Sequence, residues 1–186
     1  MDVFLFMMKH RALLVLVVPG IFLSSLGACA PMEKIQWETV SDPGFSILMP
    51  GKPVKSEEKS LTAGGEISAH TLTVDVDREE FSFTYSDYPH TQRMDSIEAA
   101  QIFDLTRNNL LAMKATRKLI SEKEIALNSN PGREVIFEDA SEGSSNTVRL
   151  YWAKPRLYTV VFARIKSRNP SGNSQKFLDS FKILSQ

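Results

Sequence analysis

Apolar and polar residues alternate along several short stretches of the chain. The clearest stretches place apolar side chains two residues apart, at Phe45, Ile47 and Met49, at Phe81, Phe83 and Tyr85, and at Val148, Leu150 and Trp152. A period of two is typical of a β-strand that buries one of its faces. Short turns, such as those at Gly64-Gly65 and Asp77-Arg78-Glu79, separate these stretches. Since parallel strands need long crossovers, the sequence predicts an antiparallel sheet.

Further strands are expected in both halves of the chain. They cover residues 54–62, 66–76, 118–127, 133–139, 146–153 and 157–165. The last of these is apolar on both faces, which predicts a central strand that is covered on both sides. Asn130-Pro131-Gly132 predicts a turn, and residues 141–146 predict a loop.

Two helices complete the predicted set of elements. The longer runs from Asp95 to about Thr116, with Asp95 as its cap and Glu98 completing a capping box. Its apolar stripe consists of Ile97, Ala100, Phe103, Leu110 and Met113. The shorter helix covers residues 174–183, with the inward-facing residues Phe177, Leu178, Phe181 and Leu184. The predicted fold class is α+β, an antiparallel β-sheet with one long and one short helix packed on it.

The first 28 residues are typical of an export signal rather than of a folded domain. Lys9 and Arg11 precede a mostly apolar run, which ends in Leu26-Gly27-Ala28-Cys29. That tetrapeptide resembles a bacterial lipobox, so we expect cleavage between Ala28 and Cys29 and lipidation of Cys29. An ordinary cleaved signal and an uncleaved anchor are the alternatives, and translation could start at Met1, Met7 or Met8.

The expected organisation is a signal peptide at residues 1–28, a short tether at 29–34 and a single domain at 35–186. We expect the lipid on Cys29 to hold the domain at a membrane of the cell envelope, facing the periplasm. Ala30 stands where an aspartate would favour the inner membrane, so the outer membrane is favoured. The formal net charge is zero, whereas nucleic-acid-binding proteins usually carry an excess of basic residues. We therefore do not expect a nucleic acid as partner.

No catalytic or metal-binding motif emerges from the sequence. His70 and His90 are far apart and near no cysteine, which argues against a zinc site. Residues 75–80 resemble the start of a calcium loop, but Glu80 replaces the required glycine and Ser86 the bidentate glutamate. The pairs Glu57/Glu58 and Asp139/Glu142 are explained by exposed loop charge. We therefore expect no enzyme activity, no metal and no cofactor.

Aromatic residues offer a weaker indication of function. Trp152 shares a strand face with Val148 and Leu150, so it is expected in the core. Tyr88, Tyr151 and Tyr158 fall near strand ends or on the alternate face. Since exposed tyrosine is favoured in recognition, these three are candidates for a partner surface.

The order of several short motifs resembles that of a known group of exported proteins. The motifs are FSILMPGKP at 45–53, YSDYP at 85–89, KEIAL at 123–127, PGRE at 131–134, RLY at 156–158 and FLDSFK at 177–182. Together they resemble the PsbP-like group, which includes DcrB-type bacterial lipoproteins of uncharacterised function. The resemblance implies an α/β/α sandwich and a non-catalytic protein that docks on a partner or supports an envelope complex.

Three hypotheses about function follow. The first is a lipid-anchored accessory or protein-interaction module with an envelope protein as partner. The second is a small-ligand-binding lipoprotein with a pocket between sheet and helix, for which a cavity with converging polar groups would speak. The third, an enzyme of unfamiliar type, requires a cleft that joins His70 or His90 to carboxylates.

Overall fold

A computed structural model describes residues 35–62, 65–89, 97–166 and 172–184. These residues belong to one compact unit, which runs from Lys34 to Gln186. The predicted signal segment, Cys29 and the tether at 29–34 lie outside the described residues, as do Asp95 and His90.

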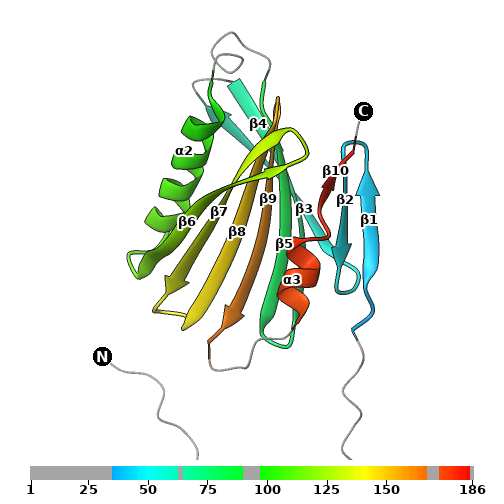
Figure 1. The fold of residues 1–186 in the computed structure, drawn as a ribbon, viewed down its shortest axis with the longest axis vertical. Coiled ribbons are helices and arrows are strands. Elements are labelled where there is room, and N and C mark those ends of the chain that lie inside the picture. Colours follow the sequence, from blue (N-terminus) through cyan, green and yellow to red (C-terminus); the bar gives the residue numbers. More distant parts are fainter. Residues whose placement is uncertain (1–34, 63–64, 90–96, 167–171, 185–186) are drawn as a thin grey trace, which may run out of the picture. The chain divides into compact units, whose positions relative to one another are not determined.

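Two antiparallel sheets form most of the described unit (Figure 1). The larger has the strand order β3-β4-β5-β9-β8-β7-β6, and the smaller has the order β1-β2-β10. In chain order the strands are β1 Glu38–Asp42, β2 Phe45–Met49, β3 Val54–Thr62, β4 Gly65–Val76, β5 Glu79–Asp87, β6 Arg117–Leu127, β7 Asn130–Asp139, β8 Ser144–Ala153, β9 Arg156–Ile165 and β10 Lys182–Ile183. The helices are α2 Ala99–Ala112 and α3 Asn173–Leu178. The α+β class and the antiparallel pairing are as predicted.

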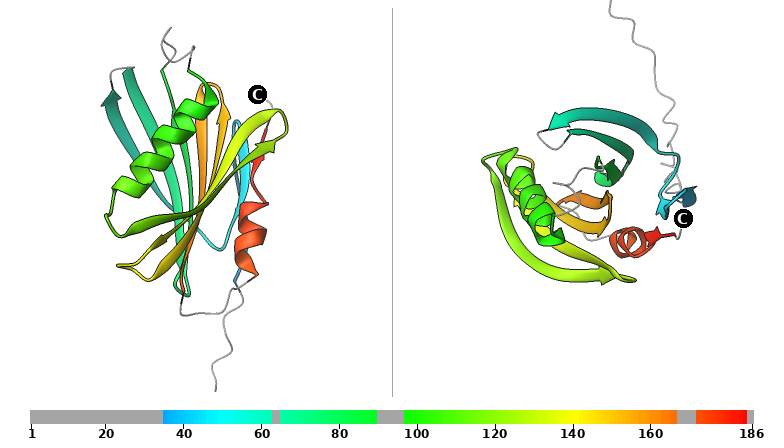
Figure 2. Two further views of the ribbon diagram at one scale, coloured as in Figure 1. Left: turned by 60° about the vertical axis from the view of Figure 1, so that its left-hand side comes forward. Right: turned by 90° about the horizontal axis from the view of Figure 1, so that it is seen from above.

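The two faces of the large sheet are covered at different places. On one face α2 packs against β6 and β7, above a core that includes Phe103, Val135 and Val148. On the other face β2 and α3 cover β4, β5 and β9, around Phe83 and Phe177. Figure 2 shows α2 over one half of the sheet, away from α3 and the small sheet. Each half of the sheet is therefore packed mainly on one side.

The central strand β9 takes part in both cores, as its pattern predicted. Tyr158, Val160 and Phe162 face the core under the small sheet, whereas Leu157 and Val161 face the core under α2. Because neighbouring residues of a strand point to opposite faces, only a strand covered on both sides buries such a run.

The C-terminal segment differs from the prediction. The helix ends at Leu178, and residues 182–183 form a strand that pairs with β2. Ser180 marks the change, since its hydroxyl accepts a hydrogen bond from the Leu48 amide (3.0 Å) and donates one to the Phe177 carbonyl (2.6 Å). Phe177, Leu178 and Phe181 are buried as expected. Leu184 is not, because it lies beyond β10 and is 40% exposed.

Several other boundaries are corrected as well. The turn predicted at residues 130–132 lies at Asn128-Ser129, where Asn128 has a φ of 56°, and β7 already begins at Asn130. The loop predicted at 141–146 is shorter, since β8 begins at Ser144. The structure also adds β1, which the sequence had not indicated. The large sheet dominates the unit, and the six-residue α3 adds only a small part to one face.

The chain enters the described unit at one end of the large sheet. Trp37 packs edge-on against Phe81, with ring centroids 5.9 Å apart, and the Lys176 ammonium lies 4.4 Å above the Trp37 ring. Phe81 is the third residue after the β4–β5 turn. The first aromatic side chain of the domain is thereby fixed at the end of the sheet that carries this turn.

Candidate functional site

A groove lies between the C-terminal half of α2 and the large sheet. Phe137, Val148 and Val161 form its apolar floor, and Leu110 and Met113 line it from the side of the helix. It has a volume of about 660 Å³, which falls within the range of about 300–1,000 Å³ that is usual for ligand sites. It exists because α2 covers only one half of this face.

Arg117 holds the end of α2 against the sheet. Its guanidinium donates hydrogen bonds to the Leu110 carbonyl (2.7 Å) and, through Nε, to Asp139 Oδ2 (3.2 Å). The guanidinium also lies 5.1 Å from the centre of the Phe137 ring. One side chain therefore joins the helix, β6 and β7 at the wall of the groove.

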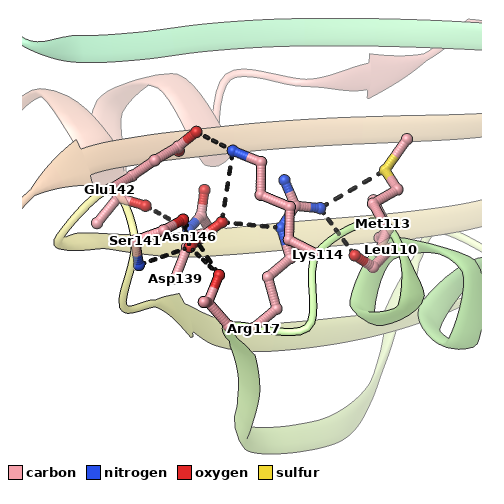
Figure 3. A network of polar contacts seen from close by, with 10 residues as sticks. Leu110, Met113, Lys114, Arg117, Asp139, Ser141, Glu142 and Asn146 are labelled. Carbon is pink, nitrogen blue, oxygen red and sulfur yellow. Dashed lines mark hydrogen bonds and ion pairs between the residues drawn. The ribbon is translucent and has the colours of Figure 1, made fainter.

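Asp139 is the centre of this polar network (Figure 3). Its side chain is only 1% exposed. Oδ1 accepts hydrogen bonds from the Ser141 hydroxyl (2.6 Å) and from the Thr116 hydroxyl (2.8 Å), and Lys114 Nζ lies 3.7 Å from Oδ2. The Ser141 hydroxyl, and then Thr116 and Arg117, hold the pKa of Asp139 well below its usual range, against the opposing effect of burial. Asp139 thus stays ionised and fixes the wall.

Glu142 completes this wall, but it does not form a catalytic acid pair with Asp139. Lys114 lies between the two carboxylates and forms ion pairs with both. The sequence had explained this pair by exposed charge, which fits the exposed Glu142 but not the buried Asp139.

The opposite rim of the groove carries the turn between β4 and β5. Asp77 and Arg78 both have positive φ angles, 52° and 67°, and form the hairpin turn that the sequence predicted in place of a calcium loop. The pKa of Glu80 is raised, first by partial burial and then by the charges of Asp75 and Glu142, while Arg117 acts in the opposite direction.

These groups suit binding more than bond-breaking chemistry. Among the described residues that line the groove there is no histidine or cysteine. Two of its buried polar residues, Ser144 and Asn146, bond to each other, Nδ2 of Asn146 donating to Ser144 Oγ at 3.1 Å. In the described part of the chain, no group of three histidine, cysteine, aspartate or glutamate side chains could hold a metal ion.

Two of the three tyrosines proposed as a partner surface are buried, so that prediction is wrong for them. Tyr151 is 5% exposed and stacks on Phe181, and Tyr158 is 2% exposed and donates a hydrogen bond to the Gly44 carbonyl (3.0 Å). The small sheet and α3 cover the face on which both lie. Tyr88 is partly exposed and packs edge-on against Trp152, which is buried as predicted.

His70 does not belong to the groove. It stacks on Tyr85 with ring centroids 4.7 Å apart, and its Nδ1 lies 3.8 Å from Glu57 Oε2. These three residues line a smaller hollow of about 310 Å³ beside β1, on the other face of the sheet. This hollow joins His70 to the carboxylates of Glu57 and Asp42, as the enzyme hypothesis required, but it is separate from the groove beside α2.

The second hypothesis placed a pocket between sheet and helix, but the sequence did not indicate which residues line the groove. Met113 and Ala100 were assigned to the buried stripe of the long helix, but both are exposed, Met113 by 72%. Ile102 takes their place in the core and is 1% exposed. The sequence carried one indication that this end of the helix is exposed, because Met113 ends the stripe and the charged Lys114 follows it directly.

Comparison with known proteins does not assign this chain to a family. No family model and no curated protein matches the chain. Among solved structures, the immunity protein TplEi of T6SS from Pseudomonas aeruginosa, complexed with "L" peptide, gives a TM-score of 0.38 at 13% identity over 63% of this chain and 48% of that one. The apo structure of TplEi gives 0.40 at 14% identity over 66% and 46%. This chain thus aligns with about half the length of that protein, and likeness at this level assigns no function.

The described helices contain no stretch long and apolar enough to cross a membrane.

Proposed function

We propose that the protein is a lipid-anchored, non-catalytic protein of the cell envelope that binds an envelope protein partner in the groove beside α2. The observation that carries the binding role is the groove itself, with an apolar floor and charged rims. The lipobox-like motif at Leu26–Cys29 supports the anchor, and Ala30 favours the outer membrane. The motif order supports a PsbP-like or DcrB-type relationship, and with it the α/β/α sandwich as the finer description of the fold.

A small-molecule ligand is the second candidate. The volume of the groove favours it, since about 660 Å³ would hold a compact ligand. The open position of Met113 at the rim gives access to either kind of partner. Tyr88 is the one residue of the predicted tyrosine surface that can still contact a partner.

Replacing Cys29 with serine should release the protein from the membrane. Serine cannot take the thioether-linked lipid, so the acyl chains that hold the domain at the bilayer are lost. We expect the wild-type protein in the membrane fraction with the mass of its lipid, and the Cys29→Ser protein in the soluble fraction without that mass. If both proteins fractionate with membranes at equal mass, the anchor proposal is wrong.

A photo-crosslinking amino acid at position 113 should capture the partner in living cells. Met113 is 72% exposed at the groove, and Leu61 on the edge strand β3 is 87% exposed outside it, which makes position 61 the matched control. We expect adducts from position 113 well above those from position 61, with intact mass showing whether the partner is a protein or a small molecule. Equal or absent adducts would contradict binding in the groove.

A further inference from the structure

The lining of the groove changes from acidic to apolar across the sheet. Strand register places Asp75 opposite Glu80, Glu80 opposite Ala163, and Ala163 opposite Asn146. The adjacent row on the same face continues through Val161 and Val148 toward α2. Neighbouring strands are about 4.8 Å apart, so Glu80 on β5 lies one strand from Val161 on β9 and two strands, about 10 Å, from Val148 on β8.

The acidic edge of the groove consists of Asp75 and Glu80, although Arg78 and Arg164 also line the groove. Within the described part of the chain neither Asp75 nor Glu80 forms an ion pair, whereas Glu142 on the facing rim is paired with Lys114. Burial and the charges of Asp75 and Glu142 together disfavour the ionised form of Glu80. A cation placed beside Glu80 would relieve this repulsion, whereas a phosphate group would add to it.

We propose that the groove binds a polypeptide segment that places an aliphatic side chain on Val148 and Val161 and a lysine or arginine side chain against Asp75 and Glu80. The proposal rests on the function proposed above and names the chemistry of its partner. A basic side chain with an apolar stem matches the change from apolar floor to acidic rim, because the stem lies on apolar surface while the charged end reaches the carboxylates.

The test combines the crosslinker at position 113 with removal of the two carboxylates. In the Asp75→Asn/Glu80→Gln protein we expect about a three- to tenfold loss of adduct, the range for two exposed charge pairs. Glu38→Gln/Glu58→Gln removes the same charge from exposed positions outside the groove and should leave the adduct yield unchanged. Sequencing of the crosslinked peptide should show lysine or arginine within a few residues of the attachment point.

The outcomes separate the two proposals. If the protein that carries the crosslinker at position 113 and no other substitution gives no adduct, the proposal that the groove binds a partner is wrong. If the adduct persists in the Asp75→Asn/Glu80→Gln protein, or if the captured molecule is a lipid or a peptide without basic residues, the groove binds but the basic partner is wrong. Misfolding is checked by the protease resistance of the variant in cells, which should not fall, since the fold disfavours the ionised form of Glu80 and glutamine removes that charge.

Discussion

Replacing Phe83 with alanine should lower the free energy of unfolding by about 3–5 kcal/mol. Its side chain is fully buried, and its ring lies 4.6 Å from that of Phe45, 5.3 Å from Phe181 and 6.2 Å from Tyr158. The variant leaves a cavity where β2, β9 and the C-terminal segment meet. A domain of this size has a total stability of only about 5–15 kcal/mol, so a large unfolded fraction is expected. Equilibrium unfolding in urea measures the loss.

Leu61→Ala provides the control for this prediction. Leu61 is 87% exposed on β3, so its truncation should change stability by no more than about 0.5 kcal/mol. A Phe83→Ala protein that unfolds at the same urea concentration as Leu61→Ala would show that this aromatic cluster is not packed as described.

Substitution of Gly132 by alanine should destabilise the protein by about 1–3 kcal/mol, although it adds a single methyl group. A Cβ atom at this position would lie 2.6 Å from the Leu150 carbonyl oxygen and 2.7 Å from the Tyr151 ring. Gly132 pairs with Tyr151 across β7 and β8, so the clash involves the backbone of a neighbouring strand and cannot be relieved by a side-chain rotation alone. The midpoint of urea unfolding provides the measurement.

The matched control is Gly172→Ala. A Cβ atom there meets nothing within 4 Å, and only a few tenths of a kcal/mol are expected from its place at the start of α3. Equal unfolding midpoints for the two alanine variants would rule out the close approach of β7 and β8 at Gly132.

The strands could be predicted because their signal is local. The alternation at Phe45–Met49 and at Phe81–Tyr85 directly reflects which face of a strand is buried. The central position of β9 followed from the apolar residues on both of its faces. Neither inference required knowledge of which elements pack together.

Burial of Tyr151 on β8 could not be predicted in the same way, whereas Tyr158 lies on β9, whose coverage on both faces was predicted. Whether the alternate face of β8 is covered depends on where the small sheet and α3 lie, and this is a property of topology. The strand β10 was missed for a related reason. The apolar spacing of Phe177 and Phe181 fits a helix, while the hydrogen bond of Ser180 with Leu48 that accompanies its end is tertiary.

The residues that line the groove could not be predicted from the sequence, because they are far apart along the chain. Glu80 belongs to the β4–β5 hairpin, Met113 to the end of α2, and Glu142 to the turn before β8. Each was explained locally as exposed charge or as part of an apolar stripe. Only the order of the strands in the sheet brings them together.

The packing of Trp37 has a bearing on how the domain would face a bilayer. If Cys29 carries the lipid, the six residues up to Ile35 can span no more than about 20 Å. Trp37 is fixed against Phe81, near the same β4–β5 turn that forms the acidic rim. The chain thus enters the domain at the end of the sheet that carries this rim, so a lipid on Cys29 would keep the rim within reach of partners that protrude only a short distance from the membrane.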